Sequence, residues 1–384
     1  MNIRSLLLGS AAALVAVSGA RAADAVTVAE PEPAQYVKVC DVYGAGYFYI
    51  PGTETCLRIG GYLRYDIGVG DSGSFDGVNN VPDQKKGNGD TNDTYWKRAR
   101  LSLRTWTGQE TELGTLKTYT ETRFNFGNNV GDYSDQSDDN AGRNNWQAHN
   151  STSLNFAWIQ LGGLRVGKDE SAFDEFIGYT GDVIQDTLVP YGGFDTNVIQ
   201  YYYDAGNGLS GVISLEEGAS DGTGDTSIDS YVPNVVGGVK YTQGWGAITG
   251  VISYDSNWEE WAGKIRADVT ISPELSLFVI GGYGSDDNIA RNYYKEWGGN
   301  WAFWTGGAYK INEKTTFNAV VSGDEDKNYG VAANIAYEAV PGLVVTAEVD
   351  YLHAGKFDDA DFFNWTGANK KNSVGGVLRF QRNF

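Results

Sequence analysis

Positively charged side chains recur at regular spacing in several segments of the chain. Arg98, Arg100 and Arg104 are separated by even numbers of residues in one segment, and so are Arg58 and Arg64 in another. Residues two apart in a β-strand point to the same side, so these guanidinium groups would repel one another unless water or carboxylates surround them. In hydrocarbon each would cost about 2 to 4 kcal/mol near the bilayer midplane. We therefore expect a wet cationic face, or alternatively a solvated face without selectivity, formed by Arg58, Arg64, Arg98, Arg100, Arg104, Lys117, Arg123 and Arg165.

Carboxylates gather in one long stretch between two predicted strands. The stretch contains Asp169, Glu170, Asp174, Glu175, Asp182, Asp186 and Asp195. Acids that face a cationic wall across water would set up an electric field between the two surfaces. Asp182 and Asp186 lie near the middle of the stretch and are the preferred pair. For any single carboxylate, a solvated loop acid is the competing interpretation.

Other reactive residue types lack the spacing that catalysis or metal binding requires. His149 and His353 are far apart and have no zinc-ligand spacing around them. The acid pairs have no sequence context for paired-carboxylate hydrolysis. A cluster of four aspartates could hold Ca²⁺ through several oxygens, but without EF-hand spacing a solvated loop is favoured; it consists of Asp132, Asp135, Asp138 and Asp139. We expect no enzyme activity, no cofactor and no metal site.

The N-terminal residues have the pattern of a cleaved export signal. Arg4 precedes an apolar run from Leu6 to Val17, and Ala20 and Ala22 form a small-x-small site after it. We expect cleavage after Ala22. The alternative, a membrane anchor, would need about 20 apolar residues.

Two cysteines, Cys40 and Cys56, follow the predicted cleavage site. An exported chain enters an oxidising compartment, so a disulfide is expected, with two free thiols as the alternative. Closing a loop of about 15 residues would contribute about 3 kcal/mol in the chain-entropy model. The net charge of -20 argues against a nucleic-acid partner, which requires a basic face.

Strict alternation of side-chain type runs along much of the chain. Apolar and polar residues alternate in segments 57–67, 98–104, 116–126, 263–271 and 343–351, which is the pattern of β-strands with one apolar face. A soluble β-sandwich would alternate in the same way. The strands alone therefore predict only a large all-β protein.

The connections between these strands alternate in length. Short ones are expected at 107–114, 161–163, 204–208, 243–246, 272–273, 312–313 and 339–342. Long ones are expected at 70–93, 127–150, 168–195, 217–231, 285–296 and 355–371, with shorter outward connections at 255–259 and 323–327. Short periplasmic turns and long outer loops are typical of transmembrane barrels. The count predicts an antiparallel barrel of about sixteen strands, and barrels of that size enclose an aqueous lumen.

The C-terminal segment reads as a strand from Ser373 to Phe384. Leu378, Phe380 and Phe384 share its apolar face, whereas Arg382 places a charge in that series. A terminal Phe on such a strand resembles the sorting signal read by the outer-membrane insertion machinery. No Pro-rich or Ser-rich linker divides the chain, so we expect one barrel at 56–384. It follows a signal peptide at 1–22 and an N-terminal segment with the disulfide-linked loop at 23–55.

Two segments carry a resemblance to a known family. Val39–Ile59 (VCDVYGAGYFYIPGTETCLRI) and Leu154–Lys168 (LNFAWIQLGGLRVGK) resemble the alphaproteobacterial porins, and Val189–Asp195 (VPYGGFD) resembles the end of a porin third loop. The likeness spans the chain from the signal peptide to Phe384. It implies a sixteen-stranded homotrimer whose third loop folds into the lumen and sets its acids against a basic wall.

Together these features predict a general outer-membrane channel for passive diffusion of small hydrophilic solutes and ions. Its partners would be outer-membrane lipid and lipopolysaccharide. Three alternatives remain: a substrate-specific, sugar-type channel, a surface adhesin anchored by a barrel, and a secreted soluble β-protein or glycoside hydrolase. A barrel of sixteen strands argues against the adhesin, because eight strands suffice for an anchor.

Overall fold

The computed structural model describes residues 38–72, 80–86, 90–128, 148–219, 227–357, 366, 368 and 370–384. The chain divides into two units at Val39, and the second unit, Val39–Phe384, contains all the regular structure given below. The predicted signal peptide with Ala20 and Ala22 lies outside the described residues. The four aspartates considered for calcium lie outside them too.

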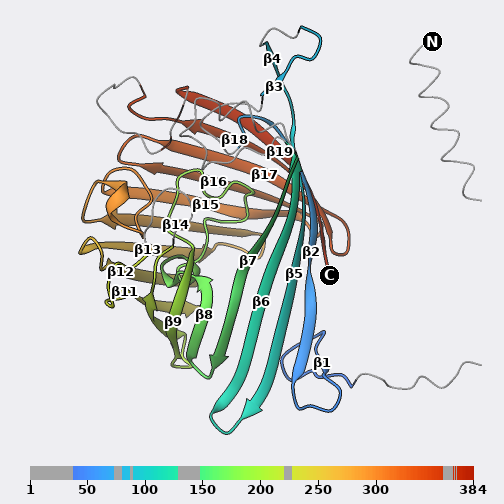
Figure 1. Ribbon diagram of the computed structural model, residues 1–384, viewed down its shortest axis with the longest axis vertical. Helices are drawn as coiled ribbons and strands as arrows, with labels where there is room; N and C mark the ends of the chain where they lie inside the picture. The colour runs from blue at the N-terminus through green and yellow to red at the C-terminus, as the bar shows by residue number, and fades with distance from the viewer. Residues whose placement is uncertain are drawn as a thin grey trace, which may run out of the picture. The chain divides into compact units, whose positions relative to one another are not determined.

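Antiparallel strands pair in chain order and close on themselves, because β19 pairs with β2 (Figure 1). Sixteen strands of the described chain form this barrel, which confirms the predicted fold class. They are β2 (Cys56–Gly70), β5 (Trp96–Thr111), β6 (Gly114–Asn128), β7 (Ala148–Leu161), β8 (Leu164–Glu170), β9 (Asp195–Asp204), β10 (Leu209–Glu216), β11 (Asn234–Gln243), β12 (Gly246–Asp255), β13 (Glu260–Thr270), β14 (Leu275–Gly284), β15 (Trp301–Asn312), β16 (Thr315–Asp324), β17 (Tyr329–Val340), β18 (Leu343–His353) and β19 (Asn372–Asn383).

The connections at the two ends of the barrel differ in length as predicted. At one end they have two to four residues, as at 162–163 and 205–208. At the other end the connections at 256–259 and 325–328 have four residues each and the rest are longer. The longer ones include short elements, namely β3 (Asn80–Pro82), β4 (Thr91–Asp93), α3 (Ala172–Glu175) and η3 (Ile289–Arg291). Among the described residues, no helix has the length and apolar character needed to cross a membrane.

The predicted turn at 107–114 is wrong, since β5 and β6 continue to a turn at 112–113. The two strands remain paired through Thr107, opposite Thr118, and Gly108, opposite Lys117. The Thr107 and Thr118 hydroxyls lie 2.6 Å apart. Gly108 does not mark a turn; its missing side chain makes room for the ring of Tyr43, which would lie 2.7 Å from an added Cβ.

The two faces of the sheet have opposite chemistry. Along β2, Ile59 and Leu63 are more than half exposed, whereas Tyr62 and Asp66 are buried. The same alternation continues around the barrel, with Val, Ile, Leu and aromatic side chains exposed on the outside. An outward apolar belt over a polar interior is the arrangement of a barrel in a bilayer. A soluble sandwich would bury this apolar face instead.

Aromatic side chains ring the outside of the barrel near both ends. At the end with long loops these are Tyr254, Trp258, Trp261, Tyr283, Trp301, Tyr329 and Tyr351. At the end with short turns they are Tyr201, Tyr203, Tyr241, Trp245, Tyr309, Tyr337, Phe380 and Phe384. Such girdles mark the two interfaces between membrane and water. Leu378, Phe380 and Phe384 all face outward on the closing strand, as the alternation predicts.

The hydrophobic core lies inside the barrel, between the wall and the segment 171–194, which we call loop 3. Phe173, Ile177, Val189 and Tyr191 of this loop are almost fully buried. They pack against inward side chains of the wall that include Val212, Val236, Phe278, Ile280, Trp304 and Leu352. The expectation that the third loop folds into the lumen is therefore correct.

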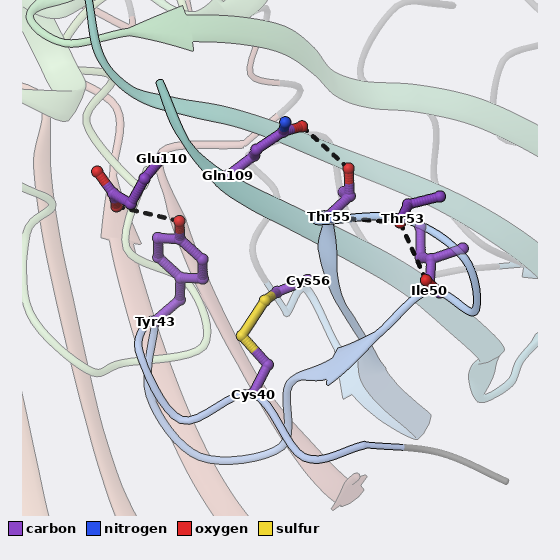
Figure 2. Close-up of a disulfide and its surroundings, with 8 residues drawn as sticks. All are labelled: Cys40, Tyr43, Ile50, Thr53, Thr55, Cys56, Gln109 and Glu110. Carbon is purple, nitrogen blue, oxygen red and sulfur yellow. Dashed lines mark hydrogen bonds between the residues drawn. A yellow bond between two sulfur atoms is a disulfide. The ribbon is translucent and has the colours of Figure 1, made fainter. Parts of the chain in front are cut away.

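A small cross-linked loop lies at the end of the barrel that has the short turns. Cys40 and Cys56 form the predicted disulfide, and β1 (Phe48–Tyr49) pairs with the first residues of β2. Figure 2 shows Tyr43 pointing toward Glu110, to whose Oε1 its hydroxyl donates at 3.0 Å. Cys56, Gly108 and Glu110 are even-numbered, like the residues of β2 and β5 whose side chains point into the barrel. The loop that contacts them therefore lies on the lumen side of the wall.

Candidate functional site

The strand register places the inward residues of β19, β2, β5 and β6 in rows across the wall. In the first row Arg379 lies opposite Asp66, which in turn lies opposite Arg98. Asp66 is fully buried and accepts hydrogen bonds from Arg379 Nε at 2.7 Å and Arg98 Nη2 at 3.0 Å. Arg64 of the next row lies 3.3 Å from the same carboxylate. Three guanidinium groups therefore share one carboxylate.

A second carboxylate organises the next part of the wall. Glu121 is almost fully buried and accepts from Arg104 Nε at 2.8 Å, Arg123 Nε at 2.6 Å and the Tyr119 hydroxyl at 2.9 Å. Arg100 has no carboxylate partner among the described residues, and its Nε donates to Asn125 Oδ1 at 2.6 Å. These side chains are partly exposed inside the barrel, as Arg104 is at 33%. These arginines thus present positive charge to water in the lumen.

A row of aromatic rings follows toward the short turns. Trp106, Tyr119 and Trp158 lie opposite one another on adjacent strands, with ring centroids 5.4 and 5.6 Å apart. Arg58 lies 4.6 Å from the centroid of Trp106, and Arg165 lies 4.1 Å from that of Trp158. Such contacts hold each guanidinium against the wall. Lys117, one row further, is exposed.

Hydrogen bonds with wall residues fix loop 3 along its length. Glu216 accepts from the Ser171 hydroxyl and the Ala172 N–H, and Glu348 accepts from the backbone N–H groups of Ile184 and Gln185. Three further wall residues donate to the loop: Lys264 to Asp174 and the Tyr191 carbonyl, Arg266 to the Gly178 and Tyr179 carbonyls, and Trp304 to the Val189 carbonyl. These anchors come from β10, β13, β15 and β18, so loop 3 lies against strands other than β19, β2, β5 and β6, which carry the arginine rows.

The predicted loop acids occupy three different environments. Asp169 and Glu170 belong to β8 and not to loop 3, because the strand continues to Glu170. Asp169 pairs with Arg165 at 2.7 Å, and the Tyr179 hydroxyl donates to Glu170. At the start of β9, Asp195 pairs with Lys168 at 2.5 Å.

Two other predicted acids hold the helical turn of loop 3. Asp174 is fully buried and pairs with Lys264 at 2.5 Å, so it secures the loop and does not line the passage. Glu175 is 34% exposed, accepts from the Tyr202 hydroxyl at 2.7 Å and lies 3.8 Å from Arg165.

The middle of loop 3 carries the preferred pair, Asp182 and Asp186. Asp182 has an exposed side chain, and its carbonyl accepts from Asn334. Asp186 is half-buried and accepts from the Tyr191 hydroxyl at 3.2 Å. Burial raises the pKa of Asp186 to about 6, against the opposing effect of the hydrogen bond from Tyr191 and a smaller one of the Arg379 charge. Asp186 therefore lies within electrostatic reach of Arg379 in the first arginine row.

Several residues that shape this site were not among the predicted set. Asp66 and Glu121 lie on the same predicted strand faces as the arginines. Arg379 lies on the polar face of the last strand, the face that does not carry Leu378 and Phe380. Parity alone would have found all three. The roles of Lys264 and Glu348 depend on contacts with loop 3 over 90 and 164 positions of sequence, which local patterns do not contain.

Comparison with known proteins identifies the family. The sequence model of the porin subfamily matches residues 24–377. The chain is 48% identical to porin Omp2b of Brucella canis over 389 residues and to porin Omp2b of Brucella suis over 390 residues. Each alignment covers 100% of both chains.

Solved structures share the fold at much lower identity. The outer membrane channel DcaP of Acinetobacter baumannii matches with a TM-score of 0.61 and 16% identity over 88% of this chain and 99% of its own. Pseudomonas putida OprB matches with a TM-score of 0.56 and 12% identity over 85% and 94%. With the family match, the closed barrel and the charged lumen together, this chain belongs to the porin family, the channel-forming proteins of the outer membrane.

Proposed function

We propose that this porin is a general diffusion channel whose narrowest part lies between loop 3 and the arginine rows. The proposal is carried by the row Arg379–Asp66–Arg98 on the wall and by loop 3, which is anchored inside the barrel and carries Asp182 and Asp186. Small hydrophilic solutes and ions would cross this field and leave toward the periplasm. Lipophilic solutes are disfavoured because they disrupt water ordered in the field. Passage by diffusion requires no nucleophile and no cofactor.

Planar-bilayer recording tests this assignment. Replacing Arg98, Arg100 and Arg104 together by Ser removes three positive charges from the wall and should shift the reversal potential toward cation preference. Arg382→Ser is the matched control, because Arg382 lies at the rim, where it donates to the Pro341 carbonyl. Unchanged selectivity in the triple variant contradicts the proposed constriction.

The aromatic row raises a second candidate, a channel specific for sugars. Sugar rings stack on free aromatic faces, but Arg58 and Arg165 cover the outer faces of Trp106 and Trp158, and Tyr119 lies between them. This arrangement favours the general pore. Liposome swelling with sugars of graded size separates the two functions: dependence on size alone supports a general pore, and preference among sugars of equal size supports a specific one.

We also propose that the chain is exported by cleavage after Ala22, sorted through Leu378, Phe380 and Phe384, and assembled as a homotrimer among lipid and lipopolysaccharide. The outer face of β5 and β6 supports a subunit contact. Thr105 and Thr120 face outward there with their hydroxyls 2.6 Å apart, and Thr107 and Thr118 repeat the pair at 2.6 Å. Polar hydroxyls and small side chains suit contact between protein surfaces in a membrane better than contact with lipid.

A further inference from the structure

We infer that Arg64, Arg98, Arg100 and Arg379, which we call the arginine cluster, form a binding site for small solutes with two negative charges. The charges would be on carboxylate or phosphate oxygens. The inference rests on the proposed function, because it assigns a solute class to the same wall. It goes further in predicting that dianions occupy the lumen while monovalent anions pass.

The arginine cluster carries an excess of positive charge. Among the described residues, Asp66 is the one carboxylate within ion-pair distance of the cluster, and it contacts Arg64, Arg98 and Arg379. Arg100 donates to the neutral amide of Asn125. Four positive charges therefore share one negative charge. A solute with two charges would compensate two of the three that remain.

The arginine cluster also has more hydrogen-bond donors than nearby acceptors. A guanidinium group has five N–H donors, and a carboxylate has about four lone-pair sites. Asp66 accepts from Arg98 and from both Nε and Nη2 of Arg379, so its capacity is largely used. The Nε atoms of Arg64 and Arg98 are buried and make no hydrogen bond, although Arg64 Nε lies 3.3 Å from Asp66 Oδ2. A second oxyanion beside Asp66 would supply the missing acceptors and let the guanidinium groups reorient.

The acids nearest the cluster do not neutralise it by direct contact: Glu348 lies on β18, the strand beside β19, and Asp186 lies in loop 3. Both carboxylate oxygens of Glu348 accept from loop 3 N–H groups, and Asn334 donates to one of them. Asp186 accepts from the Tyr191 hydroxyl. These acids hold and tune loop 3. The cluster thus keeps its excess charge next to the passage, where side chains of Arg98 and Arg379 are 24% and 16% exposed.

Register also makes the cluster compact. Arg379 and Arg98 flank Asp66 in one row, while Arg64 and Arg100 lie opposite each other in the next row. Adjacent rows are two residues apart along the strands, or about 7 Å. A small dianion could therefore contact guanidinium groups of both rows at once. Bidentate contact with oxyanions is the geometry that arginine favours.

The test is block of single-channel current in a planar bilayer. Purified full-length protein in KCl is titrated at constant ionic strength with succinate, with hydrogen phosphate at pH 8, and with acetate as the monovalent reference. We expect each dianion to halve the current at a concentration at least about tenfold lower than acetate does, since the cluster offers it two uncompensated charges. Block by only one dianion assigns the site to that oxyanion.

Two variants tie the block to the cluster. Arg100→Gln leaves all three Asp66 ion pairs intact, so it perturbs the fold least, and Arg98→Gln/Arg379→Gln removes more charge. Both should raise the half-blocking concentration of the dianions about fivefold or more. Lys240→Gln is the matched control, because Lys240 points into the barrel from β11, a strand distant from the cluster. It should leave the half-blocking concentration of the dianions unchanged.

The outcomes separate the two proposals. Equal block by dianions and acetate, or equal block in Arg100→Gln and the unaltered protein, overturns the binding site even if the open-channel reversal potential supports the charged constriction. A triple Ser variant with unchanged reversal potential overturns the constriction, whatever the dianions do.

Discussion

At the scale of single residues, two buried carboxylates decide how the cationic wall is built. Asp66 and Glu121 each hold at least two arginines by hydrogen bonds of 3.0 Å or less. Removing one member of a buried ion pair costs about 3 to 5 kcal/mol, because the other member keeps an uncompensated charge. The position of the arginines therefore depends on these acids, and replacing one acid should perturb several arginines at once.

We predict that Asp66→Asn lowers the unfolding temperature of the detergent-solubilised barrel and shifts its reversal potential toward anions. Both effects follow from leaving Arg64, Arg98 and Arg379 without their shared carboxylate. Asp268→Asn is the matched control, since Asp268 is 35% exposed in its pair with Arg266. Equal effects of the two substitutions would show that Asp66 has no special role.

Asp186 provides a pH test at the same scale. Burial raises its pKa to about 6, so the protonated form is the one that the packed loop favours. The packing of loop 3 should therefore become more stable as the pH falls through about 6. Loss of the negative charge within electrostatic reach of Arg379 should also move the reversal potential toward anions between pH 7.5 and pH 5.

The variant Asp186→Asn should reduce that shift, and Asp182→Asn, whose side chain is exposed, should retain it. Reversal potentials at the two pH values measure both. A shift of the same size in Asp186→Asn and in the unaltered channel would mean that another group titrates.

At the scale of elements, local patterns predicted the strands and their faces but not the contacts of loop 3. Arg98, Arg100 and Arg104 were assigned to the inner face because parity along a strand is a local property. Asp169 and Glu170 were assigned to the loop because charge alone does not show where β8 ends. Asp174 was expected to line the passage, yet it is buried by Lys264, a partner 90 positions away. Contacts at that distance depend on barrel closure and not on the local sequence.

The disulfide loop at 39–56 is an element whose removal can be tested. We predict that Cys40→Ser/Cys56→Ser frees this loop from the lumen wall and makes it sensitive to limited proteolysis, while the protected barrel fragment remains. The chain-entropy model gives about 3 kcal/mol for a loop of this size. Tyr43 contacts Gly108 and Glu110 of β5, and the Thr55 hydroxyl donates to Gln109 of the same strand. Tyr43→Ala with the disulfide intact is the comparison variant. A protease-resistant loop in the double variant would mean that the noncovalent contacts suffice.

At the scale of the whole molecule, the outer surface is uneven. Aromatic girdles line both ends over most of the barrel, but the outward positions of β5 and β6 near the short turns hold threonines among the described residues. Connection lengths were enough to predict sixteen strands. They carry no information on which part of the wall meets another subunit, since that depends on side chains far apart in sequence.

We predict that Thr120→Trp dissociates the proposed trimer, because a large ring on β6 would prevent close approach of two outer walls. Val279→Trp on β14 is the matched control, since Val279 is exposed in the lipid-facing belt. Sedimentation in detergent measures the assembly. Unchanged sedimentation of Thr120→Trp would exclude this face as the subunit contact.

The seam between β19 and β2 has a consequence for the order of folding. Gly61 exchanges two backbone hydrogen bonds with Phe384, and Arg379 reaches Asp66 over 313 positions. By contrast, the disulfide beside the seam spans only 16 positions. Contacts over short separations form fast and those over long separations form slowly. The cross-linked loop can therefore form in the periplasm before β2 pairs with β19. In a cell that cannot oxidise the two cysteines, the chain would reach the membrane without this loop fixed beside β2, the strand whose pairing with β19 closes the barrel.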